Sequence, residues 1–178
     1  MGFDLDSLLQ QYAGANPASA ADPAQAENDF DRVAQSAPQA DLAQGVSEAL
    51  RSDQTPPFPQ MVGQLFNQGD SGQRAGMLNQ LLSGIGPGVL SSLAGGVLGS
   101  LFGGHGNATA AAPQVTPDQA STMSPEQVQQ IAEKAEQHNP GIVDRMGEFY
   151  AQHPQLVKGL GGAALAIALG HMAQGMRR

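Results

Sequence analysis

Four histidines are the side chains of this sequence best suited to bind a metal ion. They are His105, His138, His153 and His171, and the chain has no cysteine that could join them. Two histidines that hold one metal from a single helix stand four residues apart, because residues i and i+4 share a face. No pair here has that spacing, so we predict no metal site. We expect His138 and His153 to lie at helix ends, where an imidazole can meet free backbone carbonyls.

Nucleophilic catalysis and nucleotide binding would each need a motif that the sequence lacks. No serine stands in a nucleophile elbow, and no glycine-rich phosphate loop follows a predicted strand. Residues 95–99, Gly-Gly-Val-Leu-Gly, are similar to part of a dinucleotide-binding loop. They lack the preceding strand and the downstream acid of that motif. We therefore predict that the protein is not an enzyme and has no catalytic residue, no cofactor and no cofactor-binding residue.

The negative charge is concentrated in the first third of the chain. The whole sequence has 16 acidic and 8 basic residues, a net charge of −8. Residues 1–56 contain nine acids and two arginines (−7), residues 57–116 one acid and one arginine (0), and residues 117–178 six acids and five bases (−1). Nucleic acid is bound through basic surfaces. We predict no nucleic-acid partner, and a protein partner is the alternative for the acidic part.

An uncharged stretch, residues 75–117, contains the element that should form any contact surface. Its apolar centre is residues 85–104. The large side chains of this centre step by three and four residues, as one face of a helix does: Leu90, Leu93, Val97 and Leu101. Glycines and serines recur between them every four residues, and such small residues let two helix backbones approach closely.

A second apolar run, residues 159–176, has small residues at the same four-residue spacing. Together the two runs predict contacts between helices of one chain or of two chains. The predicted residues for helix packing and self-association are Gly88, Ser92, Gly95, Gly96, Gly99, Ser100, Gly103, Gly162, Ala166 and Gly170.

Three interpretations of these apolar runs stay open: a buried core or homotypic packing, a peripheral or hairpin-like membrane contact, and a true membrane span. A span needs about 20 apolar residues. Residues 85–104 are long enough, but seven glycines, three serines and a proline lower their apolarity. Asp4 and Asp6 stand where a secretion signal needs a basic and then an apolar segment. We expect a cytoplasmic protein, with a peripheral position at the inner membrane as one outcome.

Helix-start signals recur along the chain and predict an all-α fold of about seven to nine short helices. Asp22-Pro23, Thr116-Pro117 and Ser124-Pro125 each place a capping side chain before a proline at the first helical position. Gln119 and Gln127 follow the last two caps at the spacing of a capping box. No alternation of β-branched residues indicates a strand.

The Gly/Ala-rich segment between two regions of helical periodicity predicts two helical halves joined by a flexible linker. The first is residues 1–102, an acidic region that ends in the Gly-rich apolar helix. The linker is residues 103–115, which are mostly Gly and Ala. The second half is residues 116–178, which end in the Gly/Ala-rich apolar helix.

The Gly/Leu-rich run and the Thr-Pro-Asp-Gln and Ser-Pro-Glu-Gln helix starts resemble small Gly-rich helical proteins of bacteria, among them YidB-like ones. The resemblance covers about residues 75–135. It implies an all-helical bacterial protein and carries no functional residue with it.

The sequence therefore predicts a non-enzymatic helical protein that acts by self-association, by peripheral membrane contact, or by both, through its Gly-rich apolar helices. The expected partner is a second copy or another protein, with a membrane surface as a further partner. The alternative is a helical adaptor that binds a protein through its acidic N-terminal half.

Overall fold

The protein is all-α, as predicted. The computed structural model describes residues 5–13, 22–96, 98–99 and 114–175, and no strand occurs among them. Their helices are α1 (Leu5–Ala13), α3 (Pro23–Ser36), α4 (Gln39–Arg51), α5 (Phe58–Gln68), α6 (Ser71–Ser83), α7 (Pro87–Ala94), α9 (Pro117–Ser121), α10 (Pro125–His138), α11 (Ile142–Gln152), α12 (Pro154–Val157), the 3-10 helix η1 (Lys158–Leu160) and α13 (Gly162–Gly175). The described residues thus contain 11 α-helices, more than the seven to nine expected, and two of them, α9 and α12, are only 5 and 4 residues long.

The helix starts lie where the capping signals predict them. Asp22 accepts a hydrogen bond from the backbone N–H of Ala24 at 3.2 Å, and Pro23 is the first residue of α3. Complete capping boxes join Thr116 to Gln119 at α9 and Ser124 to Gln127 at α10. Each box satisfies backbone donors that have no partner inside the helix. Local chemistry therefore fixes where these helices begin.

The described chain forms two compact units whose boundaries differ from the predicted division at 103–115. Unit 1 combines residues 1–57 with residues 147–178, and unit 2 is residues 58–146. The C-terminal apolar helix takes its partners from the first 57 residues, so two segments that are distant in sequence share one core. Most of the predicted linker, residues 103–113, lies outside the described residues.

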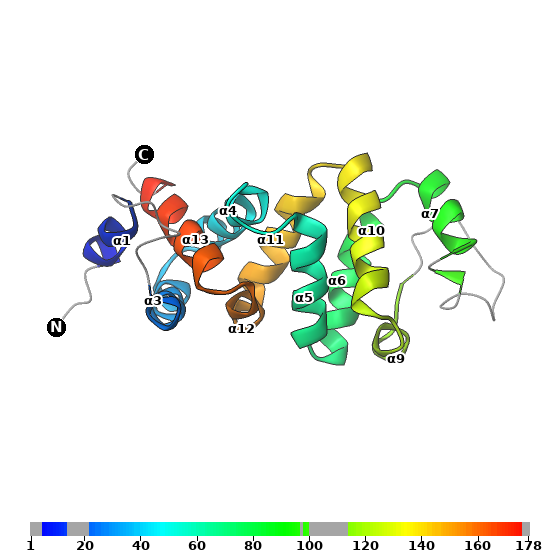
Figure 1. Cartoon of the computed structure of the whole chain (residues 1–178), viewed down its shortest axis with the longest axis horizontal. Helices are drawn as coiled ribbons and strands as arrows, with labels where there is room; N and C mark the ends of the chain where they lie inside the picture. The colour runs from blue at the N-terminus through cyan, green and yellow to red at the C-terminus, as the bar shows by residue number, and fades with distance from the viewer. Residues whose placement is uncertain (1–4, 14–21, 97, 100–113, 176–178) are drawn as a thin grey trace. The chain divides into compact units, whose positions relative to one another are not determined.

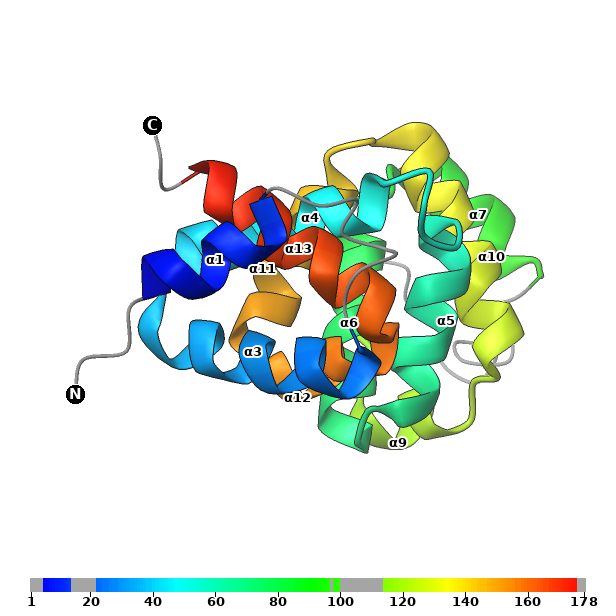
Figure 2. The ribbon, with the colours of Figure 1, turned by 60° about the vertical axis from the view of Figure 1, so that its left-hand side comes forward.

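Helix α13 is the centre of unit 1. It packs against α4, α1 and α3, and Figures 1 and 2 show these helices around it. A helix that is apolar on every side must be surrounded by other helices or by lipid. Its buried residues lie on all sides of the helix: Gly162, Ala164, Leu165, Ala166, Ile167, Ala168, Leu169, Gly170, Met172 and Ala173.

Small residues let the helices of unit 1 approach closely. A Cβ atom on Gly45 of α4 would lie 2.8 Å from the backbone oxygen of Ala168 on α13. A Cβ atom on Gly147 of α11 would lie 2.8 Å from the backbone oxygen of Ala43 on α4. Real Cβ atoms do not approach other atoms this closely, so both contacts depend on glycine.

Unit 2 is built on α10, which packs against α5 and α6 (Figure 1). Arg74 of α6 ties the end of α5, because its guanidinium donates to the backbone oxygens of Phe66 and Asn67 at 2.9 Å each. The Asn79 side chain holds the segment before α9, since it accepts from Val115 N–H at 2.7 Å and donates to Val115 C=O at 3.2 Å. These polar contacts set the positions of the elements around α6.

Candidate interaction surface at helix α7

Helix α7 is shorter than the helix that the sequence predicts for residues 85–104. It begins at Pro87, ends at Ala94, and is followed by a turn at Gly95 and Gly96. The N–H of Leu98 donates to the carbonyl of Leu93 at 2.9 Å, which folds the chain back over the helix end. Two consecutive glycines favour this turn because they have the lowest helix propensity apart from proline. The expected continuous face from Leu90 onward therefore ends at Leu93 within the described residues.

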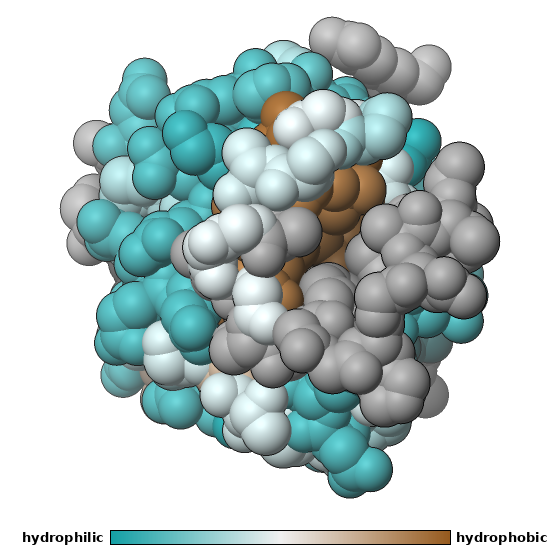
Figure 3. All heavy atoms as spheres, turned by 90° about the vertical axis from the view of Figure 1, so that its right-hand side faces the viewer, coloured by the Kyte–Doolittle hydropathy of each residue, from teal (hydrophilic) through white to brown (hydrophobic). Residues whose placement is uncertain are grey.

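The surface of α7 carries small and apolar side chains and no charge. Gly88, Ser91 and Ser92 are exposed, whereas Val89 and Leu90 are half-buried. Figure 3 shows the face of unit 2 on which α7 lies, where apolar side chains line a hollow beside paler surface residues. Half-buried apolar side chains beside small exposed ones make this face a candidate interaction surface.

The predicted packing residues of the central run have no close neighbour on this surface. Among the described residues outside its own turn of helix, none has an atom within 4 Å of a Cβ built on Gly88, and the nearest described atoms to Gly95 and Gly96 are backbone oxygens of α7 itself, at 3.7 and 3.9 Å. Ser92 is exposed and donates to the carbonyl of Val89, and Gly99 is half-buried. Ser100 and Gly103 lie outside the described residues. Within the part of unit 2 that the structure describes, no other element packs closely against these glycines.

The C-terminal packing residues are in the opposite situation. Gly162, Ala166 and Gly170 are buried in unit 1. A Cβ on Gly162 would lie 2.7 Å from the Cβ of Pro23, so this glycine allows the starts of α13 and α3 to meet. These three small residues therefore pack against helices of the same chain.

Sequence reasoning missed two further glycines at close interhelical contacts, Gly45 and Gly147. Their signal is a glycine on the apolar face of an amphipathic helix. Gly45 follows Leu42 by three residues and precedes Ala49 by four, and both of these are buried. A glycine there costs helix propensity, so a close backbone contact is the physical reason to look for.

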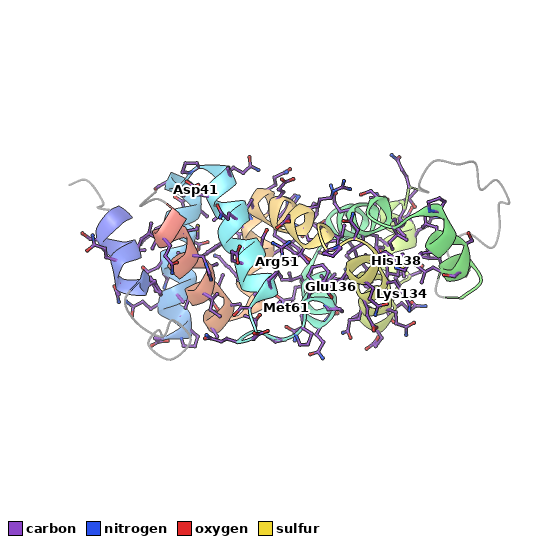
Figure 4. The ribbon with its side chains drawn as sticks, turned by 90° about the horizontal axis from the view of Figure 1, so that it is seen from above. Asp41, Arg51, Met61, Lys134, Glu136 and His138 are labelled. Atoms are coloured by element: carbon purple, nitrogen blue, oxygen red, sulfur yellow. The ribbon has the colours of Figure 1, made fainter. Side chains whose placement is uncertain are left out.

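The described histidines occupy helix ends and surfaces. His138 lies in the last turn of α10, where its Nδ1 is 3.2 Å from the carbonyl of Lys134, and Figure 4 places both residues on one side of the helix. His153 precedes α12 and its ring centroid lies 4.7 Å from that of Phe149. His171 is exposed on α13, and His105 lies outside the described residues. Among the described residues, no group of three His, Cys, Asp or Glu side chains gathers to hold a metal.

The strongest electrostatic perturbations of the described residues concern buried tyrosines and one glutamate of α10. Burial raises the pKa of Tyr150, and burial together with the nearby Asp29 raises the pKa of Tyr12. Burial and the neighbouring Glu133 raise the pKa of the Glu136 carboxyl, which Figure 4 labels on α10. Helix α7 has no ionisable side chain of its own, and none of these groups lies on it.

By length and composition, no individual helix within the described ranges is suited to cross a bilayer. Only residues 154–160 and 162–175 taken together pass that test, and they are bent by 119° at Gly161. No protein-family model matches the chain, and no curated protein or solved structure is significantly similar to it.

Proposed function

We propose that this protein acts without catalysis, by contact of its Gly-rich apolar surface with a second copy or with a membrane surface. Helix α7 is the contact element. In this proposal the protein is cytoplasmic and meets the inner membrane peripherally. The C-terminal run serves a different purpose, because Gly162, Ala166 and Gly170 are already packed inside unit 1.

The observation that carries the proposal is that no described element packs against Gly88 of α7 or against Gly95 and Gly96 of the following turn. Glycine in a helix costs about 1 kcal/mol relative to alanine. Among the described residues of unit 2, none approaches the position of the missing side chain of Gly88, since a Cβ there would have none of their atoms within 4 Å. If a partner packs closely against the backbone at Gly88, the absence of a side chain is favourable there and offsets this cost.

The size of α7 predicts how strong the contact is. Its eight residues form only about two helical turns. A stable interface buries roughly 1,200 Å² or more in total, and a helix of this length offers much less. We therefore expect weak self-association that becomes significant when copies are concentrated, as they are on a membrane surface.

The alternative function, an adaptor that binds through the acidic N-terminal part, has less support. Two of its acids are engaged inside unit 1: Asp29 with Tyr12, and Asp31 in an ion pair with Lys158. The remaining acidic side chains include exposed Asp22, which caps α3. A charged partner would thus meet fewer free carboxylates than the sequence count suggests.

The test compares Gly88→Leu with the wild-type full chain. A Cβ at position 88 has no described atom within 4 Å, so we expect the Gly88→Leu variant to keep its fold. Close packing predicts that the variant self-associates less in analytical ultracentrifugation. A simple apolar anchor predicts tighter binding to liposomes of anionic and zwitterionic lipids.

Gly175→Leu is the matched control, since a Cβ at Gly175 of α13 also meets nothing within 4 Å. It adds the same apolar side chain away from α7 and should change neither measurement. A second variant, Gly96→Leu, should act like Gly88→Leu, because the nearest atom to its Cβ is 3.9 Å away. A wild-type chain that stays monomeric when concentrated and leaves liposomes unbound would contradict the proposal and favour the adaptor.

A further inference from the structure

We draw no further inference here: the strongest candidate, the apolar hollow beside helix α7 on the surface of unit 2 (Figure 3), belongs to the interaction surface already described, and nothing in the described part of the chain shows what covers it.

Discussion

Gly147→Ala should destabilise the protein although alanine is the better helix former. Gly147 lies within α11 and faces α4 of unit 1. The new Cβ would stand 2.8 Å from the backbone oxygen of Ala43 and closer still to the hydroxyl of Ser47. That hydroxyl is held in place, because it donates to the same Ala43 oxygen at 2.8 Å. The Ala43 oxygen cannot move without shifting α4, and the Ser47 hydroxyl can move only by giving up this hydrogen bond.

The magnitude follows from two opposing effects. Replacing glycine by alanine inside a helix gains about 1 kcal/mol. Inserting a methyl group into a closely packed contact costs about 1–3 kcal/mol, and the upper part of that range applies because one of the two neighbours is backbone. We expect a net loss of about 1–2 kcal/mol in the free energy of unfolding.

Urea unfolding followed by far-ultraviolet circular dichroism measures this loss. Gly63→Ala in α5 is the matched control, because the three atoms nearest to its Cβ all belong to the half-exposed side chain of Gln129, which can change its rotamer. The control should be neutral or more stable by up to about 1 kcal/mol. The double variant Gly147→Ala with Ser47→Ala should recover part of the loss. A Gly147→Ala protein as stable as the wild type would refute the close approach of α11 and α4.

Three further predictions concern single contacts. Asn79→Ala should cost about 1–3 kcal/mol of unfolding free energy, since both backbone groups of Val115 lose their partner, and urea unfolding measures it. Gly161→Ala should cost about 1–3 kcal/mol in the same assay, because the backbone at Gly161 has φ of 83° and ψ of 160°. Tyr12 and Tyr150 both have a pKa raised by burial, so their contribution to stability is complete below about pH 10 and is lost as the pH rises above that value. Ultraviolet absorbance should therefore show tyrosinate only as the protein unfolds, and titration of either tyrosine near pH 10 in the folded protein would contradict their burial.

The helix starts could be predicted because they depend on neighbouring residues. The boxes Thr116/Gln119 and Ser124/Gln127 satisfy their own backbone groups within four residues, so no distant contact is needed. One box was not predicted: Asp70 and Gln73 form a capping box at the start of α6, which begins at Ser71. Asp with Gln at this spacing is the same signal in a less common form.

The candidate site was predicted only in part. The sequence indicates that small residues in both apolar runs are suited to close packing, and Gly162 is packed in that way. It could not indicate that Gly88 has open space around it, because exposure depends on which helices cover α7. The open glycine and the buried one have the same local pattern.

The sequence by itself determined the all-α class and the helix starts, since helix periodicity and capping depend on residues within a few positions of each other. Tertiary structure decided how the helices are grouped. Helix α13 is apolar on every side and must be covered, and the helices that cover it, α1, α3 and α4, come from the other end of the chain. No local signal encodes such a pairing, because burial of apolar surface is non-directional and depends on which faces fit together.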